Sequence, residues 1–129
     1  MKLRLPVKIL VVDDETEVRE LCQRVLKKDG YIVHLAENGL EALEILHNNS
    51  YHVAIVDLKM PTIDGMGVLR EIKDNYPQTD VIIITGYGTI RSAVEAIQQG
   101  AANYLPKPFG IEDLNGMIKD CLKRQGLIQ

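Results

Sequence analysis

The sequence predicts an α/β fold in which a parallel five-stranded sheet carries helices on both faces. Short runs of β-branched and other apolar residues alternate along the chain with longer segments of helical periodicity. Three of these runs, residues 8–12, 53–56 and 81–84, are almost entirely apolar, which indicates strands buried on both sides. Strands of that kind are typical of parallel sheets covered by helices.

Five segments are expected to be strands. The three strongly apolar runs are joined by residues 32–36, whose mixed character indicates a position nearer an edge, and by the short segment 103–105. Apolar residues three and four positions apart follow each strand and predict five helices. These periods run over residues 18–26, 40–46, 68–72, 90–97 and 111–122.

Helix ends are marked by residues that cannot continue a helix. Gly30 and Gly100 follow the first and fourth helical periods, and Pro77 follows the third. Gly116 lies inside the fifth period and lowers its helix propensity by about 1 kcal/mol. Thr89 precedes the fourth period in a glycine-rich segment, so it is a candidate N-cap.

The strict strand–helix alternation predicts the order of strands in space. Right-handed crossovers give a parallel sheet, and the most apolar strands, the first, third and fourth, belong in its centre. This favours the spatial order 2-1-3-4-5, a single flavodoxin-like (βα)5 domain. Ligands of such sheets bind beyond the carboxyl ends of the strands, between the first and third.

Length and composition indicate one domain over residues 1–129, with its core at about 8–122. The net charge of −3 argues against direct nucleic-acid binding, and no apolar run is long enough to span a membrane. No signal peptide is visible at the amino end. Cys22 and Cys121, the two cysteines, fall on apolar helical positions, which favours a reducing, cytoplasmic location.

Chemically informative residues follow the predicted strands. Asp13 and Asp14 follow the first strand and Asp57 the third, while Thr85 and Lys107 follow the fourth and fifth. Neighbouring strands lie about 4.8 Å apart, so these side chains should meet at one edge. Clustered carboxylates need a compensating cation, and oxygen ligands favour Mg²⁺. A nucleophilic aspartate, a metal, a lysine and a hydroxyl together suit phosphoryl transfer.

Taken singly, the same residues have simpler explanations. Asp13 or Asp14 could cap the following helix, and Lys107 between two prolines could be a solvated loop lysine. The glycines of segments 65–67 and 86–88 are interpreted as turn residues rather than a phosphate-binding loop. The three histidines lack the spacing of metal ligands. The convergence of five residues on one edge is what favours a functional site.

These motifs resemble the receiver domains of bacterial two-component response regulators. The resemblance covers about residues 8–122 and rests on segments 9–15, 57–61, 64–65, 85–86 and 104–109. The segment 85–89 is similar to receivers attached to sigma-54-dependent activators.

The resemblance implies a function for each residue of the edge. Asp57 would accept a phosphoryl group from a sensor histidine kinase, and Asp13, Asp14, Asp57 and the Lys59 backbone carbonyl would hold Mg²⁺. Thr85 and Lys107 would contact phosphoryl oxygens. The family also has a cis peptide bond at the position of Lys107–Pro108.

The same resemblance implies a phosphorylation-dependent switch. Movement of Thr85 would let Tyr104 turn inward and remodel the face made by the fourth helix, fifth strand and fifth helix. That face could mediate a homodimer. The chain could be a stand-alone receiver or belong to a regulator whose effector domain lies outside it. The lifetime of the phosphate is expected to depend on Lys59 and Tyr87.

The resulting expectation is a phosphoacceptor regulator that assists only its own phosphotransfer and dephosphorylation, not a turnover enzyme. One alternative is a phosphatase of the haloacid-dehalogenase type, but that class wants a second acid where Lys59 stands. The other is a flavodoxin-like cofactor carrier. Its first loop should bind phosphate through Ser, Thr and Gly, whereas segment 13–15 is acidic.

Overall fold

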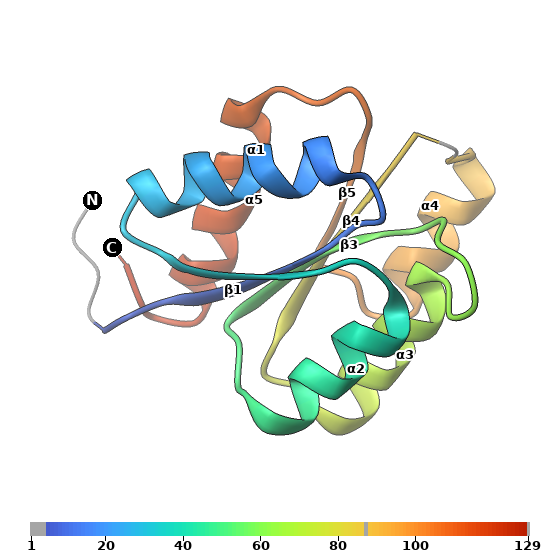
Figure 1. Cartoon of the computed structure of the whole chain (residues 1–129), viewed down its shortest axis with the longest axis horizontal. Helices are drawn as coiled ribbons and strands as arrows, with labels where there is room; N and C mark the ends of the chain where they lie inside the picture. Colours follow the sequence, from blue (N-terminus) through green and yellow to red (C-terminus); the bar gives the residue numbers. More distant parts are fainter. Residues whose placement is uncertain (1–4, 87, 129) are drawn as a thin grey trace.

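The computed structural model describes residues 5–86 and 88–128. In this part of the chain, strands and helices alternate (Figure 1). The strands are β1 (Lys8–Val12), β2 (Ile32–Ala36), β3 (Val53–Asp57), β4 (Asp80–Thr85) and β5 (Asn103–Pro106). The helices are α1 (Thr16–Lys28), α2 (Gly39–Asn48), α3 (Gly65–Asn75), α4 (Ile90–Gln98) and α5 (Ile111–Arg124).

The strands form one parallel sheet in the order β2-β1-β3-β4-β5, which confirms the predicted fold class and strand order. The register pairs Val12 with Val56, Asp57 with Ile84, and Thr85 with Pro106. The carboxyl ends of the four strands β1, β3, β4 and β5 therefore lie along one edge of the sheet, where the functional residues were expected.

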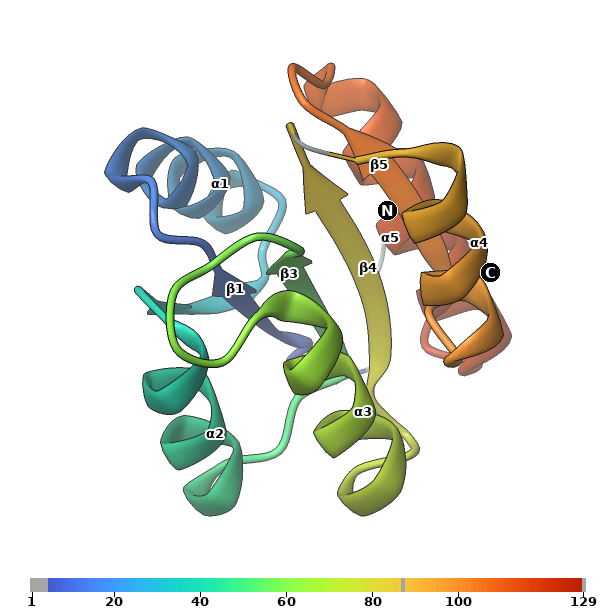
Figure 2. The ribbon, with the colours of Figure 1, turned by 90° about the vertical axis from the view of Figure 1, so that its right-hand side faces the viewer.

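Helices cover both faces of the sheet. In Figure 1, α1 and α5 lie above the sheet and α2 and α3 lie below it, and Figure 2 shows α4 beside β5. Alternate residues of β4 supply the two cores, Ile82 and Ile84 on the α1 and α5 side and Val81 and Ile83 on the other. Within the described residues, no helix has the length and apolar character needed to cross a bilayer.

Helix α4 leaves most of its apolar period exposed. The apolar period predicted the helix correctly, but Ile90 is 87% exposed, and Val94 and Ile97 are each 49% exposed. The small residue Ala96 is the one that α4 buries. Because α4 lies beside the edge strand β5, only a narrow side of the helix meets the protein and the apolar stripe is left in solvent.

The glycines at 65 and 67 are not turn residues. Both lie in the first turn of α3, where Asp64 is the N-cap and accepts a hydrogen bond from the Gly67 N–H at 2.9 Å. A Cβ on Gly65 would overlap the backbone carbonyl of Asp57 and the Cα of Leu58. Glycine is needed there because the helix starts in direct contact with the end of β3.

Candidate functional site

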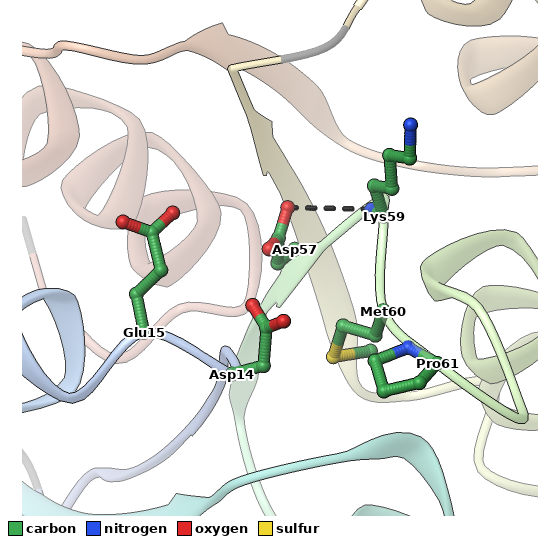
Figure 3. Close-up of a pocket in the computed structure, with 6 residues that line it drawn as sticks. All are labelled: Asp14, Glu15, Asp57, Lys59, Met60 and Pro61. Carbon is green, nitrogen blue, oxygen red and sulfur yellow. Dashed lines mark hydrogen bonds between the residues drawn. The ribbon is translucent and has the colours of Figure 1, made fainter.

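Four carboxylates gather at the carboxyl edge of the sheet. Asp13 follows β1, Asp57 is the last residue of β3, and Asp14 and Glu15 lie in the loop before α1. One oxygen from each lies within 4.8 Å of the others. Figure 3 shows the side chains of Asp14, Glu15 and Asp57 facing the same space.

Burial separates these acids into two pairs. Asp13 and Asp57 are 0% and 3% exposed, whereas Asp14 and Glu15 are exposed. Burial, followed by repulsion from Asp13, raises the pKa of Asp57 to about 6 against the attraction of Lys107. Burial likewise raises the pKa of Asp13, although Lys107 opposes it. The two buried carboxylates thus place more negative charge at this edge than burial readily accommodates.

Lys107 is the cation of this site. Its Nζ lies 2.8 Å from Asp13 Oδ2, 2.8 Å from Glu15 Oε1 and 3.5 Å from Asp57 Oδ2. Burial would lower the pKa of the ammonium, but hydrogen bonds and attraction from these carboxylates outweigh it and raise that pKa. The Lys107–Pro108 peptide bond is cis, as expected. Lys107 is therefore a fixed charge rather than a solvated loop lysine.

The backbone around Asp13 is held by its neighbours. Asp13 Oδ1 accepts a hydrogen bond from the Glu15 N–H at 2.8 Å, and the Asp13 N–H donates to the Ala36 carbonyl at 3.1 Å. Arg19, almost buried in α1, donates to the Asp13 carbonyl at 2.7 Å. The N-cap of α1 is Glu15, and no side-chain cap bond is made, so the capping interpretation of Asp13 or Asp14 is wrong.

Lys59 contributes its backbone to the site. Its N–H donates to Asp57 Oδ1 at 3.3 Å, and its side chain extends away from the carboxylate (Figure 3). A cavity of roughly 430 Å³ opens here. Its lining comprises Asp14, Glu15, Asp57, Lys59, Met60 and Pro61. The space beside Asp57 is large enough for a metal ion and a phosphoryl group.

The other two predicted residues lie next to this cluster. Thr85 is buried at the end of β4, and its carbonyl accepts a hydrogen bond from the Lys107 N–H at 2.9 Å. Tyr104 in β5 is half-buried, and its hydroxyl lies 3.3 Å from Ser92 Oγ of α4. Tyr87, which was expected to affect phosphate lifetime, lies outside the described residues.

Two contributors were not anticipated. Glu15 belongs to the quoted acidic segment but was given no function, because its contact with Lys107 spans 92 positions. Arg19 shows no distinguishing pattern within a charged helix. The available signal for Arg19 was a basic residue six positions after the acid that follows the first strand, although an arginine on a helix is usually solvated.

The donor set suits Mg²⁺. Each of the four acids offers a hard oxygen ligand, and two of them are buried without enough positive charge to balance them. Carboxylates with room for water and a phosphate oxygen are the usual surroundings of Mg²⁺. Cys22 and Cys121 are buried in the core and free, so they offer no softer site here.

Fold and site together define a doubly wound α/β domain with an acidic, lysine-bearing site at its topological switch point. The model of the response regulator receiver domain matches residues 9–119. The chain belongs to this family and is a receiver domain of response regulators.

Known proteins agree with this assignment. The response regulator MprA of Mycobacterium sp. (strain KMS) is 38% identical over 120 residues, which are 93% of this chain and 52% of MprA. A receiver domain structure from Clostridium thermocellum is 40% identical, with a TM-score of 0.87 over 93% of this chain and 97% of that one. The response regulator TrrA of Thermotoga maritima, solved in complex with Mg²⁺–BeF, is 36% identical, with a TM-score of 0.81 over 90% and 99%.

The chain spans about half the length of the curated relatives it matches. The shared region is the receiver domain, and the activities of the longer proteins therefore do not pass to this chain by similarity alone.

Proposed function

We propose that the protein is a phosphoacceptor signalling module in which Asp57 receives a phosphoryl group from a phosphohistidine of a sensor kinase. The observation that carries this proposal is the placement of buried Asp57 beside Asp13, with Lys107 Nζ 3.5 Å from its Oδ2 and an open cavity in front of it. A buried carboxylate beside a cation and an open cavity is a good phosphoryl acceptor. The cation can neutralise the negative charge of the phosphoryl group as it arrives.

The transfer would form one bond and break one. An Asp57 carboxylate oxygen forms a bond with phosphorus while the phosphorus–nitrogen bond of the phosphohistidine breaks and returns its electron pair to the imidazole. Lys107 pairs with a phosphoryl oxygen, and the Thr85 hydroxyl, at the neighbouring strand end, donates to another. Return to the resting state is hydrolysis of the acyl phosphate.

Mg²⁺ is the cofactor that this donor set supports. Asp13, Asp14 and Asp57, with the Lys59 backbone carbonyl, are the proposed ligands, and Glu15 lies in the same group of acids. When bound, Mg²⁺ supplies positive charge that offsets the carboxylates and the phosphoryl oxygens. The TrrA structure in complex with Mg²⁺–BeF supports this proposal from a relative of the same fold.

Phosphorylation would act as a switch rather than as one step of a turnover reaction. It adds about −1.5 to −2 charges and new acceptor oxygens beside Thr85 and Lys107. We infer that Tyr104 moves in response to this change and thereby remodels the face formed by α4, β5 and α5. The exposed stripe of Ile90, Val94 and Ile97 on that face is proposed to bind a second copy of the chain.

Neither alternative is favoured by a specific observation. The position where a dehalogenase-type phosphatase needs its acid/base carries exposed Lys59. The first loop, where a flavodoxin-like carrier would bind a phosphate, presents Asp14 and Glu15. The likeness to receivers of sigma-54-dependent activators, an effector domain elsewhere and a cytoplasmic location stay predictions.

Intact-mass measurement tests the proposed function. The wild-type protein is incubated with Mg²⁺ and a small-molecule phosphodonor such as acetyl phosphate, beside Asp57→Asn and the control Asp74→Asn, an exposed acid of α3. We expect a gain of one phosphoryl group in the wild type and the control, abolished by EDTA, and none in Asp57→Asn. Equal labelling of Asp57→Asn, or none in the wild type, would refute the proposal.

A further inference from the structure

Glu15 occupies a position where its residue type is a poor choice. It is the N-cap of α1, where Ser, Thr, Asp and Asn are preferred because their short side chains reach the free N–H groups of the first turn. Glu15 makes no such cap bond. Its side chain turns instead toward the sheet edge and accepts a hydrogen bond from Lys107 Nζ at 2.8 Å.

Glu15 is one of three carboxylates that surround the Lys107 ammonium. Asp13 Oδ2 is equally close to the ammonium at 2.8 Å, and Asp57 Oδ2 is farther away at 3.5 Å. Glu15 therefore takes a donor of Lys107 that would otherwise be available to a group on Asp57. Only 12% of the Lys107 side chain is exposed, so few other arrangements are open to it.

Glu15 also stands between two cavities. It lines the cavity of roughly 430 Å³ in front of Asp57 and a second one of roughly 460 Å³. The second is lined by Glu15, Val18, Leu21, Gly86, Lys107, Pro108 and Phe109. Glu15 is the residue that lines both spaces, and Lys107 lines the second, so an anion arriving at Asp57 meets the Glu15 side chain that holds Lys107.

We propose that Glu15 is a positioning residue that holds Lys107 in the unphosphorylated protein and competes for it with the phosphoryl group on Asp57. This inference rests on the proposed function. An incoming phosphoryl group must draw Lys107 from Glu15, and the Glu15 carboxylate also repels it. Because Glu15 is 55% exposed, the competition is modest, in the range of a partly solvated ion pair.

The test is a titration with beryllofluoride, an anionic phosphoryl mimic, at saturating Mg²⁺. Glu15→Gln removes the charge and leaves only a weaker, neutral acceptor for Lys107, Glu15→Asp keeps the charge on a shorter side chain, and Glu17→Gln removes an exposed acid in the first turn of α1. We expect both Glu15 variants to bind the mimic about 1.5- to fivefold more tightly than the wild type, with Glu17→Gln unchanged. A damaged fold would weaken binding, so tighter binding separates positioning from structural support.

Each other result counts against the inference. If the wild type binds and Glu15→Gln binds equally or more weakly, Glu15 does not compete for Lys107. If Glu15→Gln alone tightens while Glu15→Asp matches the wild type, charge at a distance explains the effect and the contact does not. If the wild type fails to bind the mimic, the proposed function itself falls, and this inference falls with it.

Discussion

The hydroxyl of Tyr104 occupies the place where a side chain on Gly88 would begin. A Cβ at position 88 would overlap the Tyr104 Oη and lie 2.8 Å from its Cζ and 2.9 Å from Thr85 Cγ2. Gly88 thus touches the two residues that the proposed switch connects. The position of Tyr104 in this structure, with its hydroxyl 3.3 Å from Ser92 Oγ, requires glycine at position 88.

Replacing Gly88 with alanine is therefore expected to displace Tyr104. Overpacking of this kind costs about 1–3 kcal/mol, so the free energy of unfolding in urea should fall by that amount. Adding Tyr104→Phe should restore part of the loss, because it removes the hydroxyl but leaves Cζ in place. The control is Gly116→Ala, where a Cβ on α5 meets nothing within 4 Å. Gly116→Ala should stabilise the helix by about 0.5–1 kcal/mol. If the free energy of unfolding of Gly88→Ala falls by no more than the size of the change in Gly116→Ala, the steric argument is contradicted.

Arg19→Ala should weaken both the fold and the proposed Mg²⁺ site. The change leaves the buried Asp13 carbonyl without the donor that now lies 2.7 Å away, which costs about 1–3 kcal/mol. Because the Asp13–Asp14 segment loses this restraint, Mg²⁺ affinity should also fall, as calorimetric titration can show. Arg24→Ala, an exposed arginine of the same helix, serves as the control. If folded Arg19→Ala binds Mg²⁺ as tightly as the wild type, the prediction for Mg²⁺ affinity is wrong and Arg19 contributes only to the stability of the fold.

Protonation of His52 should destabilise the protein as the pH falls. His52 Nδ1 accepts the Lys8 N–H at 3.0 Å, an arrangement that requires an unprotonated Nδ1. Burial, with a contribution from the Lys8 ammonium, lowers the pKa of His52 from 6.5. The unfolded chain therefore binds the proton more readily, and His52 contributes stability above pH 6.5 that is lost as the pH falls through its lowered pKa.

The measurement is the free energy of unfolding between pH 5 and 8 for the wild type and His52→Asn, whose amide oxygen can replace Nδ1 as the acceptor. The difference between the two proteins should shift in favour of the variant at the acidic end. His47→Asn, which changes an exposed histidine, should follow the wild type. Parallel curves for the wild type and His52→Asn would show that His52 is not the group responsible.

Lys59→Met is expected to shorten the lifetime of the phosphorylated protein. In the structure the Lys59 side chain points away from Asp57, so the ammonium must swing toward the phosphoryl group to pair with it or to exclude water (Figure 3). Autodephosphorylation, followed by intact mass after removal of the phosphodonor, checks this. Lys73→Met, in α3, gives the matched loss of a lysine away from the site. An unaltered rate in a protein that lacks both Lys59 and Tyr87 would remove the basis for the prediction.

The sheet and its acidic edge could be predicted because both follow from local patterns. Segments such as 53–56 and 81–84 are apolar on both faces, which places them in the sheet centre, and the residues that follow such strands must share one edge. Asp57 is informative for the same reason, since an acid that ends a buried strand requires a partner. Parallel pairing then brings it to Asp13 without further information.

Other features depend on contacts that local patterns do not encode. The apolar period of α4 indicates a helix but not whether Ile90 and Val94 face the core or solvent, because that depends on which strand is the edge. Gly65 resembles a turn glycine, and only the approach of α3 to Asp57 explains it. The partner of Glu15 lies 92 positions away in the sequence, so no local pattern indicates this contact.

The division between buried Asp13 and Asp57 and exposed Asp14, Glu15 and Lys59 has a consequence for which positions tolerate substitution. The inner acids are set among strand residues of the core, so replacing them with larger or apolar groups disturbs folding and chemistry together. The outer side chains can change without disturbing that packing. Substitutions of Glu15 and Lys59 can therefore alter the surroundings of Asp57 without endangering the scaffold that holds it.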